Sequence, residues 1–330
     1  MSVAWGILST ARINRLVLAG VEKSANADVI AVASRDPARA ETYARRHGVE
    51  RAYGSYEALL EDGDVEAVYI PLPNSLHVTW TLRALEAGKH VLCEKPFSRR
   101  ADEVEQAFDL ADSAGLVLSE GFMWRHHPQT AELVQLVGEG AIGRLRLIRA
   151  AFSFQLAAEH GPADARFEPG LDGGSLMDVG SYCVNAIRLL AGEPERLAGE
   201  QVVGPSGVDL CFTATLGFGG DVAAHFDCGF VLPVREELEV VGEEGALHVA
   251  DPWHIRSPGI DKRIGNATAR IPIEEADSYQ LELDNVSRAI RGEEPLLLGR
   301  EDAVGQARAI EALYRSAGAG APVLATDWSS

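Results

Sequence analysis

Lys95, Asp178 and Tyr182 are the side chains in this sequence that could together oxidise a carbinol carbon. When a hydride leaves such a carbon, the hydroxyl proton must leave as well, so a general base has to reach the hydroxyl oxygen. A free tyrosine has a pKa of about 10, and a nearby ammonium group, which Lys95 would supply, favours its phenolate form. Asp178 and Tyr182 share one face if a helix begins near Asp178, and the carboxylate can then hold Lys95 or a substrate hydroxyl.

Each of these residues also has an ordinary structural interpretation. Lys95 can be a solvated lysine in a turn, Asp178 a helix N-cap, and Tyr182 a core aromatic with its hydroxyl at the rim. Judged one at a time, the structural interpretations are favoured. The three residues indicate catalysis only as a set, together with the resemblance described below.

The elements that must position Lys95 alternate short β-branched runs with capped helical stretches over residues 1–121. Asp36 is placed to cap one of these helices, with Pro37 in its first turn and Gly48 as its left-handed stop. The expected strands are 3–8, 29–33, 65–70, 90–93 and 116–119, and the expected helices start near residue 12 and span 37–47, 75–87 and 101–114. This alternation predicts an N-terminal dinucleotide-binding Rossmann domain, residues 1–121, with a doubly wound parallel sheet.

An open parallel sheet binds ligands beyond the carboxyl ends of its strands, so the loops after the first four strands should converge on one crevice. A dinucleotide fold favours GxGxxG after the first strand, because glycine lets the backbone approach the pyrophosphate. Here all three glycines are replaced, and an ordinary tight turn explains the segment equally well. The positions read Ser9, Thr10, Ala11, Arg12, Ile13 and Asn14.

The residues at the end of the second strand indicate whether NADP or NAD binds. NAD-binding folds place a carboxylate there for the ribose hydroxyls, whereas NADP-binding folds replace it and add a cation. Ser34 can donate a hydrogen bond to a phosphate, and Arg35 can pair with it or stack on the adenine. This favours NADP over NAD. The alternative is that Arg35 is a solvated surface charge and that Asp36 binds the ribose.

From about residue 122 the pattern changes to longer strand-like runs joined by glycine-rich turns, with three helical stretches. A C-terminal domain with a large, open and mostly antiparallel sheet is expected over residues 122–330, for substrate binding and oligomerisation. The expected strands are 145–154, 208–218, 222–232, 236–241 and 268–273, and the expected helices are 181–191, 279–291 and 302–317.

Composition excludes several classes of function. Acidic side chains number 49 against 30 basic ones, a formal charge of −19, so nucleic acid and anionic membrane surfaces are not expected as partners. The sequence has no apolar run long enough to span a membrane and no basic leader, so a cytoplasmic location is expected. Its four cysteines have no metal-ligand spacing, and neither a metal nor a disulfide framework is expected.

Four segments, in this order and spacing, resemble the Gfo/Idh/MocA family of nicotinamide-dependent oxidoreductases, and the likeness covers nearly the whole chain. The first contains Pro73, Asn74 and His77, and the second is Glu94-Lys95-Pro96. The third is residues 121–125 and the fourth is residues 173–182. Tyrosine at position 182 is similar to the branch with dimeric dihydrodiol dehydrogenases, NADP-dependent D-xylose dehydrogenases and glucose-fructose oxidoreductase.

The resemblance implies a role for each matching residue. Lys95, Tyr182 and Asp178 are expected to be catalytic. Cofactor binding is expected at Ser9, Thr10, Ala11, Arg12, Ile13, Ser34, Arg35, Pro71, Asn74, His77, Glu94, Lys95, Trp124 and Arg125. Substrate binding is expected at Lys95, Trp124, Phe154, Asp178, Tyr182 and Tyr279.

The sequence thus predicts an NADP-dependent enzyme that transfers a hydride between nicotinamide and a sugar or related cyclic polyol. One alternative is a redox-neutral glycosidase that uses tightly held NAD, and another is an inactive cofactor-sensing regulator. A homodimer, or a homotetramer, through the C-terminal sheet is expected. The apolar residues expected to face outward for this contact lie among Leu210, Phe212, Ala214, Leu216, Ala224, Phe226, Cys228 and Phe230.

Overall fold

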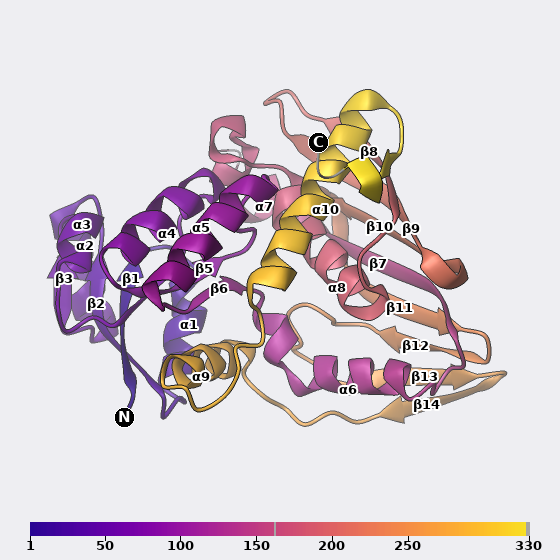
Figure 1. The fold of residues 1–330 in the computed structure, drawn as a ribbon, viewed down its shortest axis with the longest axis horizontal. Helices are drawn as coiled ribbons and strands as arrows, with labels where there is room; N and C mark the ends of the chain where they lie inside the picture. The colour runs from indigo at the N-terminus through magenta and orange to yellow at the C-terminus, as the bar shows by residue number, and fades with distance from the viewer. Residues whose placement is uncertain (162, 328–330) are drawn as a thin grey trace. The chain divides into compact units, whose positions relative to one another are not determined.

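A computed structural model describes residues 1–161 and 163–327 of the chain (Figure 1). The described residues form two compact units. The first unit contains residues 1–126 and 277–304, and the second contains residues 127–276 and the described residues from 305 onward. No helix in the described ranges is long and apolar enough to cross a membrane.

The first unit is built on a six-stranded parallel sheet in the order β3-β2-β1-β4-β5-β6. Its strands are β1 (Val3–Leu8), β2 (Ala27–Ala33), β3 (Arg51–Tyr53), β4 (Ala67–Ile70), β5 (His90–Glu94) and β6 (Leu118–Gly121). The order reverses between β1 and β4, which is where open α/β sheets bind their ligands. The predicted doubly wound sheet is confirmed.

Helices join these strands as the capping signals predict. The Asp36 carboxylate accepts hydrogen bonds from the amides of Ala38 and Arg39, and Gly48 ends the helix with φ at 70°. The helices of this part are α1 (Asn14–Val21), α2 (Pro37–His47), α3 (Tyr56–Leu60), α4 (His77–Glu86) and α5 (Ala101–Ala114), with 3-10 turns η1 (Asn74–Leu76) and η2 (Met123–His126).

A helix from the C-terminal part of the chain completes the first unit. Leu283 and Val286 of α9 (Ser278–Ile290) join the core cluster of the parallel sheet together with Trp5 and Ile7. Contacts therefore group residues 277–304 with the N-terminal unit rather than with the residues that precede them. The functional division after residue 121 stays a prediction.

The described part of the second unit contains a nine-stranded sheet in the order β14-β13-β12-β11-β7-β10-β9-β8-β15. β7 and β10 run parallel, and the other neighbouring strands run antiparallel, as predicted. The strands are β7 (Leu145–Gln155), β8 (Arg196–Val203), β9 (Asp209–Phe218), β10 (Val222–Gly229), β11 (Val231–Gly242), β12 (Gly245–Val249), β13 (Ile260–Ile264), β14 (Ala267–Ile271) and β15 (Val323–Leu324).

Helices of the second unit cover one face of this sheet, where α8 contacts β7 and β10 (Figure 1). They are α6 (Pro128–Gly138), α7 (Leu156–His160), α8 (Ser181–Ala191), preceded by the π-helical turn η5 (Leu176–Gly180), and α10 (Arg300–Ala319), which begins in the first unit.

The expectation of an outward apolar face on β9 and β10 is wrong. Phe212 and Phe226 are only 0% and 2% exposed, and the other named residues are buried too except Leu210, which is half-buried. Their period-two spacing does put them on one face, but α8 and η5 pack against that strand pair. The exposed positions between them, such as Thr213, Thr215 and His225, are polar.

Candidate active site

Lys95 directly follows β5 in the first unit, and its loop is held by polar groups of the protein itself. The Phe97 amide donates to the Glu120 carboxylate at 2.8 Å, and the Tyr69 hydroxyl donates to Glu94 Oε1 at 2.6 Å. Lys95 is half-buried, and the Lys95–Pro96 peptide bond is cis. The backbone on both sides of the lysine is thus anchored to β4 and β6.

His77 is the third anchor of this loop. Its ring is 0% exposed, with Nδ1 at 2.8 Å from the Pro96 carbonyl oxygen and Nε2 at 2.8 Å from that of Leu72. Burial, with a smaller contribution from the Lys95 charge, lowers the pKa of His77 to about 4, although the two carbonyl oxygens act to raise it. At neutral pH the uncharged ring carries one N–H and therefore donates a hydrogen bond to only one of these carbonyl oxygens, although both of its nitrogens face the backbone of the loops that follow β4 and β5.

The turn after β1 is braced in a similar way. Ser9 Oγ donates to the Pro71 carbonyl oxygen at 3.2 Å and accepts from the Ala11 amide at 3.1 Å. Asn14, at the position of the third glycine, is fully buried and donates from Nδ2 to the Ser9 carbonyl oxygen at 2.9 Å. Arg12 is exposed, while Thr10, Ala11 and Ile13 are half-buried. The side chains that replace the glycines thus shape the turn.

Cationic residues lie at the carboxyl end of β2, where an NADP-binding fold needs them. Burial raises the pKa of the Tyr56 hydroxyl, while nearby Arg35 and Arg39 act to lower it, so both guanidinium groups lie near this ring. Ser34 is buried and Arg35 is exposed. The Asp36 carboxylate caps α2 by accepting hydrogen bonds through Oδ1. This donor set fits a phosphate dianion. Arg39 and Tyr56 were not predicted, although Arg39 follows Arg35 at helical spacing.

Asp178 and Tyr182 lie on either side of a helix junction in the second unit. Asp178 belongs to the π-helical turn η5, and α8 spans Ser181–Ala191 as predicted, so Asp178 lies in the turn before the helix and not at the start of the helix itself. A Cβ atom on Gly180 would stand 2.8 Å from Cys228 Sγ of β10. Only glycine therefore lets this turn approach the sheet so closely.

Arg166 holds the Asp178 carboxylate. Its Nη1 donates to Asp178 Oδ2 at 3.1 Å, while Nε and Nη2 bind both carboxylate oxygens of Asp164 at 2.8 and 3.1 Å. A bidentate pair of this kind fixes the guanidinium plane. Sequence reasoning missed Arg166, because the loop of residues 155–171 has no recognisable motif.

Aromatic rings surround Tyr182, which is 8% exposed. Phe152 meets its ring edge-on with centroids 5.4 Å apart, and Trp253 lies at 5.9 Å. Phe154, another predicted substrate residue, is 9% exposed and packs edge-on against Phe230, while the Arg166 guanidinium lies 5.6 Å from its centroid. The second unit thus gathers Asp178, Tyr182 and Phe154 with Arg166.

The remaining predicted residues lie in the first unit. Trp124 is 1% exposed, and Arg125 of the same 3-10 turn forms a 2.9 Å ion pair with Asp302. Tyr279 of α9 packs against the core cluster of the parallel sheet. Pro71 is buried and Asn74 half-buried, in the loop that follows β4. Trp124 and Tyr279 therefore belong to a different unit from Phe154 and Tyr182.

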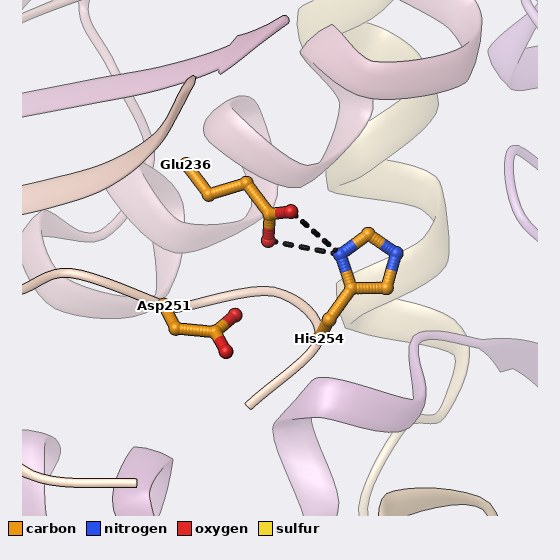
Figure 2. Close-up of side chains that lie close together, drawn as sticks. All are labelled: Glu236, Asp251 and His254. Carbon is orange, nitrogen blue, oxygen red and sulfur yellow. Dashed lines mark hydrogen bonds and ion pairs between the residues drawn. The ribbon is translucent and has the colours of Figure 1, made fainter. Parts of the chain in front are cut away.

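One group of potential metal ligands occurs among the described residues: Glu236, Asp251 and His254, which offer ligand atoms within 4.8 Å of one another (Figure 2). The guanidinium of Arg256 already binds Glu236 and lies 3.6 Å from Asp251. A single protein cation therefore already pairs with both carboxylates, and offsets one of their two negative charges.

Two family profiles match consecutive parts of this chain. The profile described as "Oxidoreductase family, NAD-binding Rossmann fold" matches residues 4–122, and the profile described as "GFO/IDH/MocA C-terminal domain" matches residues 130–248. Their boundary falls close to the point where the first compact unit gives way to the second.

Individual proteins are similar over most of their length. The chain is 39% identical over 325 residues to the D-xylose 1-dehydrogenase (NADP(+)) 2 of Haloferax volcanii, with 97% of this chain and 98% of that protein covered. It is 35% identical over 257 residues to trans-1,2-dihydrobenzene-1,2-diol dehydrogenase of Bos taurus, with 76% and 75% covered.

Solved structures show the same fold. The aldose-aldose oxidoreductase of Caulobacter crescentus, complexed with glycerol, matches with a TM-score of 0.91 at 27% identity and covers 98% of this chain and 100% of its own. A 3-ketoreductase of Actinomadura kijaniata in complex with NADP and TDP-benzene matches with a TM-score of 0.89 at 30% identity, covering 96% and 98%. This chain therefore belongs to the Gfo/Idh/MocA family of NAD(P)-dependent oxidoreductases.

Proposed function

We propose that this protein is an NADP-dependent enzyme that transfers a hydride between nicotinamide and a sugar or related cyclic polyol. The observation that carries the proposal is that Lys95, Asp178 and Tyr182 occur in a chain similar over 97% of its length to an NADP-dependent D-xylose dehydrogenase. The glycerol and sugar-nucleotide analogue bound by its structural relatives are consistent with a hydroxylated substrate.

Residues of the first unit would hold the cofactor. Ser34, Arg35 and Arg39 would take the 2′-phosphate, because they offer a hydroxyl and two cations where Asp36 is occupied as a helix cap. The predicted turn of residues 9–13 would receive the pyrophosphate at the start of α1. The nicotinamide end of the cofactor is predicted to contact the loops that carry Pro71, Asn74, Glu94 and Lys95, together with Trp124 and Arg125. NADP, when bound, supplies the hydride acceptor or donor.

The chain's own contribution is proton transfer and orientation. The Tyr182 hydroxyl oxygen would take the proton of the substrate hydroxyl during oxidation and return it during reduction. The ammonium group of Lys95 would favour the phenolate form of Tyr182. Asp178, whose carboxylate is held by Arg166, would orient the substrate, and Phe154 would contact its C–H face.

His77 enters this proposal as a positioning residue rather than as a cofactor contact. Both of its nitrogens face backbone carbonyl oxygens, so the ring supports the Lys95 loop from behind. Three expectations stay predictions. Residues 122–330 would form the domain for substrate binding and oligomerisation, the chain would form a homodimer or homotetramer through the C-terminal sheet, and its location would be cytoplasmic. The polar exposed strand positions, such as Thr213 and Thr215, would have to supply such a contact.

A panel assay at 340 nm tests the proposal. NADP and NAD are each offered with D-xylose, D-glucose, other aldoses, inositols and dihydrodiols. We expect net NADP reduction with at least one of these compounds and a weaker rate with NAD. Glycoside cleavage by enzyme that purifies with bound NAD, without net absorbance change, would instead identify a redox-neutral glycosidase. NADP binding without turnover of any compound would indicate a cofactor-sensing regulator.

A further inference from the structure

We propose that His254, oriented by Glu236, forms a hydrogen bond through Nε2 with a hydroxyl group of the substrate and so helps to select hydroxylated rings. This inference rests on the proposed function, since it assigns a further residue to the substrate side of the same site. It concerns residues 250–256, between β12 and β13, a segment in which the sequence shows no recognisable motif.

Glu236 and His254 form a pair in which the carboxylate is buried and the imidazole is open. The Glu236 side chain is 8% exposed and that of His254 is 43% exposed. His254 Nδ1 lies 2.9 Å from each carboxylate oxygen of Glu236, and Figure 2 shows the other ring nitrogen pointing away from the carboxylate. Across the described residues, that Nε2 atom has no hydrogen-bond partner.

The carboxylate orients the imidazole ring. Burial acts to raise the pKa of Glu236, but hydrogen bonding to His254 and the charge of Arg256 lower it below its usual range. An ionised carboxylate only accepts hydrogen bonds, so His254 presents Nδ1 to it as a donor, and Arg256 Nη2 lies 3.2 Å from the same nitrogen. Nε2 stays on the open side of the ring, where it can form a hydrogen bond with a hydroxyl group, which both donates and accepts.

The backbone of this loop is held in one conformation. Ile255 has φ at 51°, a left-handed value that is unfavourable for a β-branched residue. Asp251 stabilises it by accepting hydrogen bonds from the amides of Ile255 at 3.0 Å and Arg256 at 2.6 Å. Trp253 is fully buried and donates from Nε1 to the Ala151 carbonyl oxygen at 3.1 Å. His254 thus stands on a braced loop.

The same loop contacts the predicted catalytic tyrosine. Phe152 lies edge-on to both Tyr182 and His254, with ring centroids 5.4 and 5.7 Å away, and stacks on Trp253 at 6.1 Å. These four rings all belong to the second unit, and Phe152, Tyr182 and Trp253 are buried, so His254 is the open member of a packed aromatic cluster that includes the predicted catalytic tyrosine. A substrate hydroxyl bound beside this cluster would find a polar partner in the imidazole of His254.

A metal ion is the competing occupant of this cluster. Arg256 argues against it, because its guanidinium already pairs with Glu236 and lies beside Asp251, and so offsets one of the two negative charges that a cation would use. A divalent cation would have to displace this charge before it could bind both carboxylates. A neutral hydroxyl needs no such displacement, since it approaches the open side of the imidazole ring.

Imidazole NMR tests the inference without requiring turnover. Protein labelled with ¹⁵N-histidine is titrated with D-xylose, myo-inositol and glycerol, in the presence of NADP and in its absence. We expect a saturable shift of the His254 Nε2 resonance with at least one of these compounds. Assignment comes from His254→Gln, and His225→Ala is the matched control because His225 is exposed on β10. A shift that grows linearly without saturation, or none, would overturn the inference.

Further arms separate the other outcomes. Glu236→Gln removes the anionic partner, so the ring loses the contact that orients it and the affinity measured from the saturable shift should weaken roughly tenfold. Addition of Zn²⁺ or Mn²⁺ alone should leave the resonance unchanged at micromolar concentrations, and tight metal binding there would contradict the proposal. A saturable shift without NADP reduction by any compound would instead refute the proposed function while leaving the His254 contact in place.

Once a substrate is known, deoxy analogues identify the hydroxyl. Wild-type protein should discriminate against one analogue by roughly tenfold in kcat/KM, and His254→Gln should lose that discrimination while NADPH binding is unchanged. Equal effects of the substitution on every analogue would show that His254 has only a structural role.

Discussion

His77 in the first unit and His254 in the second are both held by hydrogen bonds, but they leave the ring in opposite situations. His77 is 0% exposed and both of its nitrogens face backbone carbonyl oxygens. The side chain of His254 is 43% exposed and only Nδ1 is engaged, by Glu236. A side chain with no open polar atom can position its neighbours, whereas one with an open atom can recognise a ligand.

The difference extends to the regions around the two histidines. The Lys95 loop is anchored through Tyr69, Glu120 and His77, so its polar neighbours are used within the protein. Around Tyr182 the rings of Phe152 and Trp253 form a packed aromatic cluster, which His254 borders as its open member. Substitutions beside Lys95 should therefore change stability and turnover for every substrate, while substitutions beside His254 should act on some substrates and not on others.

The largest effect is expected where both regions serve the same reaction. Lys95→Ala and Tyr182→Phe should each lower kcat by about 10²- to 10⁴-fold, because proton transfer contributes that much in such reactions. NADPH binding, followed by fluorescence, should persist in Tyr182→Phe. The double variant should be little worse than either single one if the two groups act as a unit.

Tyr314→Phe is the matched control for this pair. It removes a phenol whose hydroxyl bonds to Asp209 at 2.9 Å; because Asp209 also binds Ser175 and the Leu176 amide in the turn before Asp178, this variant controls for loss of a supporting phenol rather than of the proposed base. Its kcat should stay within a few-fold of wild type. Full multiplication of the two single effects in the double variant would show that Lys95 and Tyr182 act independently.

His77→Ala tests the role of the buried histidine in this comparison. The backbone carbonyl oxygen that accepts from the ring loses its donor, which costs about 1–3 kcal/mol of the free energy of unfolding, measured in urea at pH 8. His225→Ala, at an exposed position, should cost less than about 0.5 kcal/mol. Unchanged stability of His77→Ala would refute the positioning role.

His77 should also make the stability of the folded protein depend on pH. The pKa of His77 falls from 6.5 to about 4 on folding, so between these values the unfolded chain binds a proton that the folded chain does not. The folded state therefore loses stability as the pH falls through this window, by about 3 kcal/mol from this group at about 1.4 kcal/mol per pKa unit. Urea titrations between pH 7 and pH 4 should show this loss in wild type and a correspondingly smaller one in His77→Ala.

Arg35 sharpens the comparison within the first unit, because it is exposed there as His254 is in the second. Arg35→Ala should raise the KM for NADP roughly 10- to 100-fold, as expected for the loss of a charge-assisted hydrogen bond, and leave the KM for NAD nearly unchanged. Equal changes for both cofactors would refute a role in 2′-phosphate binding.

Arg166→Lys should have the smallest of these effects. Lysine keeps the charge beside Asp178 but cannot reproduce the bidentate contact with Asp164. We expect kcat/KM to fall roughly tenfold, with the change mainly in KM for the sugar and none in NADPH affinity. A change confined to NADPH affinity would contradict the role of Arg166 in orienting Asp178.

Much of the fold follows from local signals that the sequence carries openly. Asp36, Pro37 and Gly48 bound α2 as predicted, and the helix predicted at 101–114 is found at those residues. The position of α9 could not be predicted, because its amphipathic pattern does not say which sheet it will cover. The outward face of β9 was misjudged for the same reason.

The candidate site could be predicted only where a motif marks it. Lys95 and Asp178 lie in recognisable segments, whereas Arg166 reaches Asp178 from an irregular loop, and Glu236 and His254 meet Tyr182 through Phe152 from distant parts of the sequence. Such contacts depend on tertiary packing, which periodicity and spacing do not encode.

Deuterium transfer tests the central proposal most directly. The best substrate of the panel, deuterated at every carbon, is incubated with NADP and the wild-type protein, and the cofactor is examined by NMR. We predict one deuterium at C4 of the nicotinamide ring for each molecule of NADPH formed, and no transfer by Tyr182→Phe above about one hundredth of the wild-type rate. Substrate conversion that leaves the nicotinamide free of deuterium would contradict hydride transfer by this protein.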